Sequence, residues 1–98
     1  MTIEIKRNAE ETIIKIAGRL DTTTAPALDK TISEDIADTK KLVLDVKELE
    51  YISSAGLRVL LGAQKKMQKI GSMKVINVCE EVMEVFEMTG FADILVIE

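Results

Sequence analysis

The sequence predicts a single α/β domain, residues 1–98, in which a mainly parallel mixed β-sheet carries helices. A chain of 98 residues with 47% hydrophobic residues is long enough for one hydrophobic core but not for two. Strand patterns alternate with helix patterns in the order ββαβαβαβ. This alternation implies parallel strands joined through three main helices, with the first strand antiparallel at a sheet edge.

The N-terminal segment is expected to form a β-hairpin. Residues 2–6 alternate polar and apolar side chains with the period of a strand, and residues 12–17 are largely β-branched and apolar. Gly18 is expected to end the second strand. The charges of Glu4 and Lys6 at the sheet edge would discourage edge-to-edge association.

Three helices are predicted from apolar residues that recur every three or four positions. The first begins at Thr23 or Thr24, the second follows Ser54 and stops at Gly71, and the third spans residues 80–88. Their expected inward residues are, in order, Ala25, Leu28, Ile32 and Ile36; Leu57, Leu60, Leu61 and Met67; Val82, Val85 and Phe86.

Three further strands are expected to complete the sheet. Residues 42–46 form an apolar run typical of a strand buried on both faces, as in a parallel sheet covered by helices. Residues 73–78 and 93–97 are expected to form the fourth and fifth strands. Sites in such sheets lie beyond the carboxyl ends of the strands, which here are residues 18–24 and 48–56.

Composition argues against several functional classes. A formal net charge of −4 with few aromatic residues disfavours nucleic acid or an anionic membrane as the partner. Histidine is absent, which removes the usual catalytic triads and the usual zinc ligand but leaves carboxylate, lysine or magnesium chemistry open. A small serine enzyme would need a base near Ser54, and neither a histidine nor an evident lysine close in sequence supplies one, so no enzyme, metal or other cofactor is expected. Cys79 is expected to be a packed free thiol. With no N-terminal signal peptide pattern or long apolar run, a cytoplasmic location without membrane insertion is expected. A monomer is expected because no obvious extra apolar face remains for self-association.

Two serines stand where the loop after the third strand enters the second helix. Either Ser53 or Ser54 could act as an N-cap by accepting a backbone N–H, which is a purely structural role. Alternatively, a serine here could be phosphorylated without unfolding the domain, because free N–H groups and the positive end of the helix dipole favour a dianion. A partner docked over the same loop would then be released.

Two aspartates lie near strand ends. A metal or phosphoaspartate site built from Asp21 and Asp45 is conceivable if their carboxylates are neighbours, but one acid per strand end is a weak signal. Asp21 is therefore expected to be a surface polar residue and Asp45 a structural one. The basic side of the second helix is expected to be solvated.

Three motifs resemble the STAS-domain anti-anti-sigma factors of bacteria, also called anti-sigma factor antagonists. They are GRLD at 18–21, LVLD at 42–45 and YISSAGL at 51–57, followed by MTGF at 88–91. The resemblance covers nearly the whole chain and implies a STAS-like domain that works by partner switching. The unmodified protein would bind an anti-sigma factor that is also a serine kinase with an ATP-binding domain, which frees the sigma factor. Phosphorylation would abolish binding, and a PP2C-type phosphatase would restore it.

The resemblance also assigns residues. Ser54 matches the phosphorylated serine and Ser53 is the second choice; the family often has aspartate at the position of Ser53 and serine or threonine at that of Ala55. The implied partner surface consists of Asp21, Thr22, Thr23, Thr24, Ser53, Ser54, Ala55, Gly56, Leu57 and Arg58. The alternative is a STAS subunit of a lipid-transporting ABC system, or a stressosome-like scaffold component, without a sigma-factor role.

Overall fold

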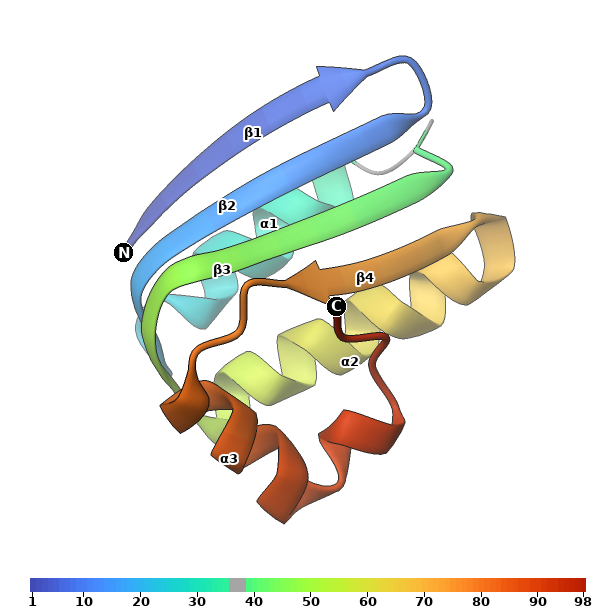
Figure 1. Ribbon diagram of the computed structural model, residues 1–98. Coiled ribbons are helices and arrows are strands. Elements are labelled where there is room, and N and C mark those ends of the chain that lie inside the picture. The colour runs from blue at the N-terminus through green and yellow to red at the C-terminus, as the bar shows by residue number, and fades with distance from the viewer. Residues whose placement is uncertain (36–38) are drawn as a thin grey trace.

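The computed structural model describes residues 1–35 and 39–98, and these form a mixed four-stranded sheet with helices (Figure 1). The strand order is β1-β2-β3-β4, with β1 (Thr2–Asn8) antiparallel to β2 (Glu11–Leu20) at one edge. Strands β3 (Lys41–Ile52) and β4 (Ser72–Ile76) continue the sheet in parallel. The expected class, with its antiparallel edge strand, is confirmed.

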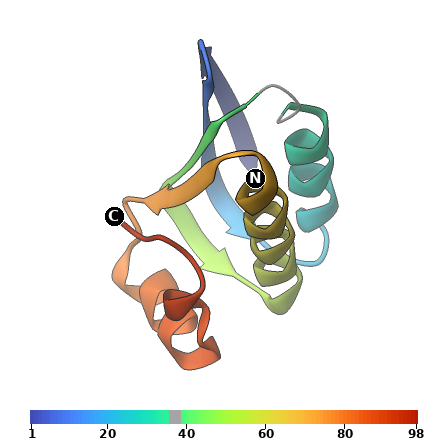
Figure 2. The same cartoon turned by 90° about the vertical axis from the view of Figure 1, so that its right-hand side faces the viewer.

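The helices divide into two groups around the sheet. Helices α1 (Ala25–Asp35) and α2 (Ser54–Ile70) lie side by side on one face, as Figure 2 shows. Helix α3 (Glu80–Thr89) lies apart from them, near the carboxyl end of β3, and leads into a short 3-10 turn, η1 (Phe91–Asp93). Among residues 1–35 and 39–98, no helix therefore covers much of the other sheet face.

The hydrophobic core fills the space between the sheet and α1 and α2, and it extends to α3. Burial of these side chains is the main term that stabilises the fold. Leu61 and Val85 are only partly buried, whereas the other inward residues expected of the second and third helices are buried. Ile36, expected in the first helix, lies outside the described residues. The largest fully buried side chains include Phe86, Ile14, Ile16, Leu20, Leu28, Ile32, Leu42, Leu44, Leu49, Leu60, Met67 and Val46.

Strand β2 does not end at Gly18, as its composition suggested, but continues to Leu20. The register between β2 and β3 shifts on both sides of Ala17 and Gly18. Gly18 has a φ of +96°, a conformation that a residue without a Cβ adopts easily. The glycine therefore makes a bulge inside the strand, and the ladder resumes beyond it.

Two further strand predictions need correction. Strand β3 runs from residue 41 to 52, well past the expected residue 46, so residues 48–52 are strand rather than loop. The expected fifth strand at residues 93–97 is replaced by the turn η1 and a single parallel bridge between Val75 and Ile97. β4 ends at Ile76 because Asn77 adopts a left-handed φ of +60°.

Candidate functional site

The site lies where β2 and β3 end side by side. Leu20 and Ile52 are paired in the last register position of the two strands. The next residue on β3, Ser53, donates its N–H to the Leu20 carbonyl at 2.9 Å. The loop that leads from β2 to α1 therefore adjoins the turn that leads from β3 into α2, as expected for the carboxyl edge of a parallel sheet.

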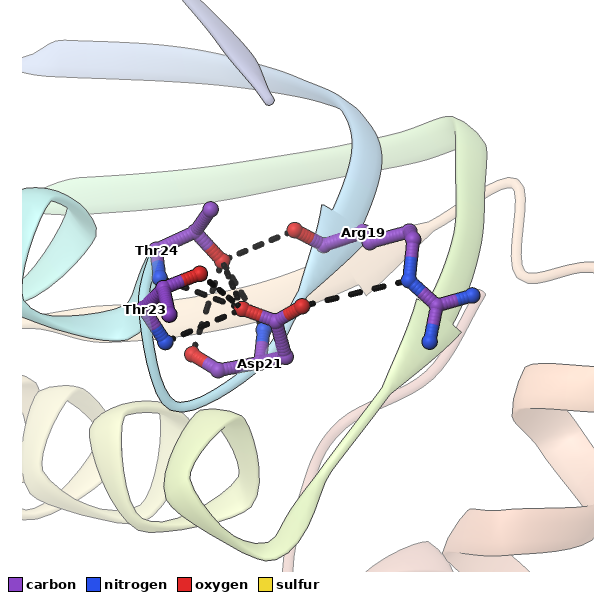
Figure 3. Close-up of polar contacts among 4 residues, drawn as sticks. All are labelled: Arg19, Asp21, Thr23 and Thr24. Carbon is purple, nitrogen blue, oxygen red and sulfur yellow. Dashed lines mark hydrogen bonds and ion pairs between the residues drawn. The ribbon is translucent and has the colours of Figure 1, made fainter.

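The loop at residues 21–24 is organised around the Asp21 carboxylate (Figure 3). Its Oδ1 accepts hydrogen bonds from the Thr23 hydroxyl at 2.7 Å, the Thr23 N–H at 3.0 Å and the Thr24 N–H at 3.2 Å. The Thr23 hydroxyl is the largest of the causes that hold the pKa of Asp21 below its usual value, and the backbone N–H groups add to it. Asp21 is thus ionised at neutral pH and fixed in one geometry.

Thr24 closes the loop from the other side. Its hydroxyl accepts the Asp21 N–H at 2.8 Å and donates to the Arg19 carbonyl at 2.8 Å. Thr24 is one of the two N-caps expected for α1, and it holds this position through its backbone, because its carbonyl accepts the Leu28 N–H at 3.4 Å and the helix begins at the next residue. Its hydroxyl is used within the loop, where the Asp21 carboxylate also accepts N–H groups. Asp21 is therefore more than a surface polar residue: it braces the loop.

The two serines at the start of α2 occupy different environments. Ser53 is the N-cap by backbone geometry and its carbonyl accepts the Leu57 N–H at 2.9 Å, but its side chain makes no capping bond. Its Oγ is buried and finds no hydrogen-bond partner among the described residues. Ser54, the first residue of the helix, is exposed. Ser53 therefore occupies the N-cap position, but the expected hydrogen bond from a backbone N–H to its side chain is absent. The solvent-facing hydroxyl is that of Ser54.

Gly56 fixes the position of this turn against the sheet. A Cβ built on it would lie 2.7 Å from Cγ of Leu20 and 2.8 Å from Cγ1 of Ile52. Both distances are far shorter than a normal carbon–carbon contact. Gly56 and Leu57 are buried, so within the expected partner surface they hold the turn in place, while Arg58 is exposed.

Arg19 and Tyr51 lie next to the Asp21 loop and are not members of the expected partner surface. The two residues are paired across β2 and β3, and the Arg19 guanidinium lies 4.2 Å above the centre of the Tyr51 ring. Nε of Arg19 is also 3.8 Å from Oδ2 of Asp21. Tyr51 is 41% exposed, so the pair adds a partly fixed aromatic and cationic surface next to the Asp21 loop. Only the strand register, which the sequence does not reveal, brings them together.

Asp45 belongs to a different part of the sheet. It pairs with Lys15 in the register, far from the position where Leu20 meets Ile52, so the two aspartates are not neighbours. Its Oδ1 accepts bonds from the Lys47 N–H at 3.1 Å and the Asn77 side chain at 3.0 Å, which is the structural role expected. Within residues 1–35 and 39–98 no cluster of three or more potential metal ligands occurs.

Two other expectations concern the environment of Cys79 and membrane insertion. Cys79 is half-buried at the start of α3, with its Sγ 3.6 Å from the Leu49 carbonyl oxygen. Among the described residues, no helix combines the length and the apolar character needed to cross a bilayer.

Comparison with known proteins gives a consistent result. The model of the STAS domain family matches residues 2–98. The anti-sigma-B factor antagonist of Bacillus subtilis is 31% identical over 96 residues, which are 97% of this chain and 88% of that protein. An anti-sigma factor antagonist from Mycobacterium paratuberculosis superposes with a TM-score of 0.89 at 25% identity, covering 98% of this chain and 83% of that one.

A third protein shares the fold at lower identity. The Bacillus cell fate determinant SpoIIAA, in its phosphorylated form, matches with a TM-score of 0.78 at 18% identity, covering 99% of this chain and 91% of that one. Its likeness supports the architecture alone, whereas the family follows from the match to residues 2–98 and from the B. subtilis relative. The chain belongs to the STAS-domain family of anti-sigma factor antagonists, which are regulatory proteins and not enzymes.

Proposed function

We propose that this protein, in its unmodified form, binds an anti-sigma factor that is also a serine kinase, and that phosphorylation of Ser54 ends this binding. The observation that carries the proposal is the contrast between the two serines. The Ser54 hydroxyl is exposed at the first residue of a 17-residue helix, whereas the Ser53 Oγ is buried beneath the turn. A kinase can reach the first without disturbing the fold.

The start of α2 can accommodate a phosphate. The first N–H groups of a helix have no partner within it, and the helix dipole places partial positive charge there. The first turn of α2 contains no acidic residue, and the exposed Arg58 follows Ser54 by four residues. Phosphorylation of Ser54 is therefore expected to leave the domain folded.

The same phosphate would oppose partner binding. It carries a charge of about −1.5 to −2, which a closed interface must desolvate. The adjoining loop already holds the ionised Asp21 carboxylate, whose pKa lies below its usual value. A partner surface that is complementary to the unmodified site would therefore meet additional negative charge, and affinity would fall.

The proposed docking surface combines both loops. Its exposed or partly exposed members are Asp21, Thr22, Thr23, Thr24, Ser53, Ser54, Ala55 and Arg58, to which Arg19 and Tyr51 are added. Tyrosine and arginine are common among residues that dominate binding energy, so the stacked pair is proposed as an anchor. The partner supplies the ATP-binding domain and the magnesium, and a PP2C-type phosphatase in the cytoplasm restores the hydroxyl.

A pull-down from native cells tests this proposal. Wild type and Ser54→Ala should retain an ATP-binding anti-sigma kinase, Ser54→Asp should lose it, and mass spectrometry of the recovered wild type should find phosphate on Ser54. Ser53→Ala is the matched control and should still be phosphorylated at the neighbouring serine. Recovery of transporter subunits or scaffold proteins with unmodified serine would contradict the proposal and favour the alternative STAS roles.

A further inference from the structure

The free edge of the sheet is long and regular. Strand β1 contains seven residues, carries no proline and pairs with β2 from Thr2 to Asn8 without a register shift. Figure 1 shows no described element on its outer side. Alternate residues of an edge strand point their N–H and C=O groups outward, where another strand can bond to them.

An apolar row runs across the sheet and ends at this edge. Ile5 is paired with Ile14, which is paired with Leu44, and Leu44 is paired with Val75. Ile14, Leu44 and Val75 are fully buried, whereas Ile5 is 40% exposed. The row therefore leaves one isoleucine open to solvent at the edge strand, on the face that carries α1 and α2.

We infer that β1 pairs antiparallel with β1 of a second copy about a two-fold axis at Ile5, which gives a homodimer with a continuous sheet. In this register Ile5 faces Ile5 of the second copy, and the apolar row continues across the axis. Glu4 faces Lys6 of the second copy, and Lys6 faces its Glu4. The interface therefore contains two pairs of opposite charge and one apolar contact between the two Ile5 side chains.

The neighbouring registers are worse. A slip of two residues one way brings Ile3 opposite Ile5 but sets Glu4 opposite Glu4 of the second copy. A slip the other way sets Lys6 opposite its own counterpart and moves Ile5 opposite Arg7. Like charges directly opposite each other destabilise a strand pair. A slip of one residue moves Ile5 out of line with the isoleucine of the other copy. The charges of Glu4 and Lys6, which discourage association in general, therefore select a single register.

Sedimentation velocity of the full chain over concentrations up to the millimolar range tests the inference. Wild type should reach twice the mass of the chain, and Lys6→Glu should weaken the dimer by about tenfold or more, because it creates two like-charge pairs. Lys6→Glu is the preferred single variant, because Lys6 faces the uncharged Ile13 within its own chain and the substitution therefore breaks no directly opposed charge pair between β1 and β2. Circular dichroism should show an unchanged fold.

Charge exchange makes the test specific to this register. Glu4→Lys alone should also weaken the dimer, yet an equimolar mixture of Glu4→Lys and Lys6→Glu should form heterodimers, and the double variant should dimerise again. A wild type that stays monomeric, a dimer that Lys6→Glu leaves intact, or single variants that do not pair would each overturn the inference. If the β1 amides became protected from hydrogen exchange only after another protein was added, the edge would belong to that protein. This result would also overturn the inferred homodimer.

Discussion

Replacement of Gly56 by alanine is the most direct test of how the site is built. A new Cβ would lie 2.7 Å from Cγ of Leu20 and 2.8 Å from Cγ1 of Ile52. These residues are 0% and 3% exposed, so neither side chain can swing into solvent. Overpacking of this kind costs roughly 1–3 kcal/mol, while the better helix propensity of alanine returns up to about 1 kcal/mol. With the full gain in helix propensity, we expect a net loss of up to about 2 kcal/mol.

Gly62 offers a matched control in the same helix. A Cβ there meets no atom within 4 Å, so Gly62→Ala should stabilise the protein by up to about 1 kcal/mol through helix propensity. The two substitutions are chemically identical, and their effects should have opposite signs.

Urea denaturation followed by far-UV circular dichroism measures both variants. For a domain of this size about 1 kcal/mol corresponds to roughly 4–8 °C in Tm, so thermal melting should separate them as well. A Gly56→Ala protein as stable as Gly62→Ala would refute the close packing of α2 on the strand ends. It would also remove the explanation for how Ser54 is held beside the loop at residues 21–24.

Three further predictions concern other parts of the chain. Gln64 is 7% exposed, and its Oε1 is buried without a hydrogen-bond partner among the described residues. Gln64→Met should raise the free energy of unfolding by roughly 1 kcal/mol, because it removes the desolvation penalty of that oxygen. A lower urea midpoint would contradict this. The pKa of Asp21 is lowered from 3.8, mainly by the Thr23 hydroxyl, so its ionised form stabilises the fold above that pH. The stability advantage of wild type over Asp21→Asn should therefore be present at neutral pH and disappear as the pH falls below 3.8 through the lowered pKa, and a pH-independent difference in denaturation midpoint would contradict it. A Cβ at Gly71 would overlap the Lys40 carbonyl oxygen, so Gly71→Ala must displace main chain. It should cost at least about 2 kcal/mol by urea denaturation, and a loss as small as that of a surface substitution would contradict this contact.

Local patterns in the sequence were sufficient for the architecture. The period of two in residues 2–6, the three-and-four spacing of apolar residues in the helices, and the apolar run at 42–46 each reflect interactions between near neighbours in the chain. Such patterns identify an element and its buried face. The position of the serines at the start of the second helix and the place of the site at the strand ends follow from the order of these elements.

Contacts between distant residues decided the rest. The bulge at Gly18 and the length of β3 depend on the register between two strands, and the expected last strand has only the bridge from Val75 to Ile97. The stacking of Arg19 on Tyr51 depends on the same register.

The difference between the two serines also belongs to the tertiary structure. Ser53 and Ser54 are adjacent and chemically identical, so the sequence alone could rank them only by resemblance to a family. The N–H of Ser53 bonds to the Leu20 carbonyl, which draws this residue against β2 and buries its Oγ, while the next residue turns outward into α2. Local patterns in the chain place a hydroxyl at this helix start. Packing against β2 buries one hydroxyl and leaves the other facing solvent, because burial depends on residues far away in the chain.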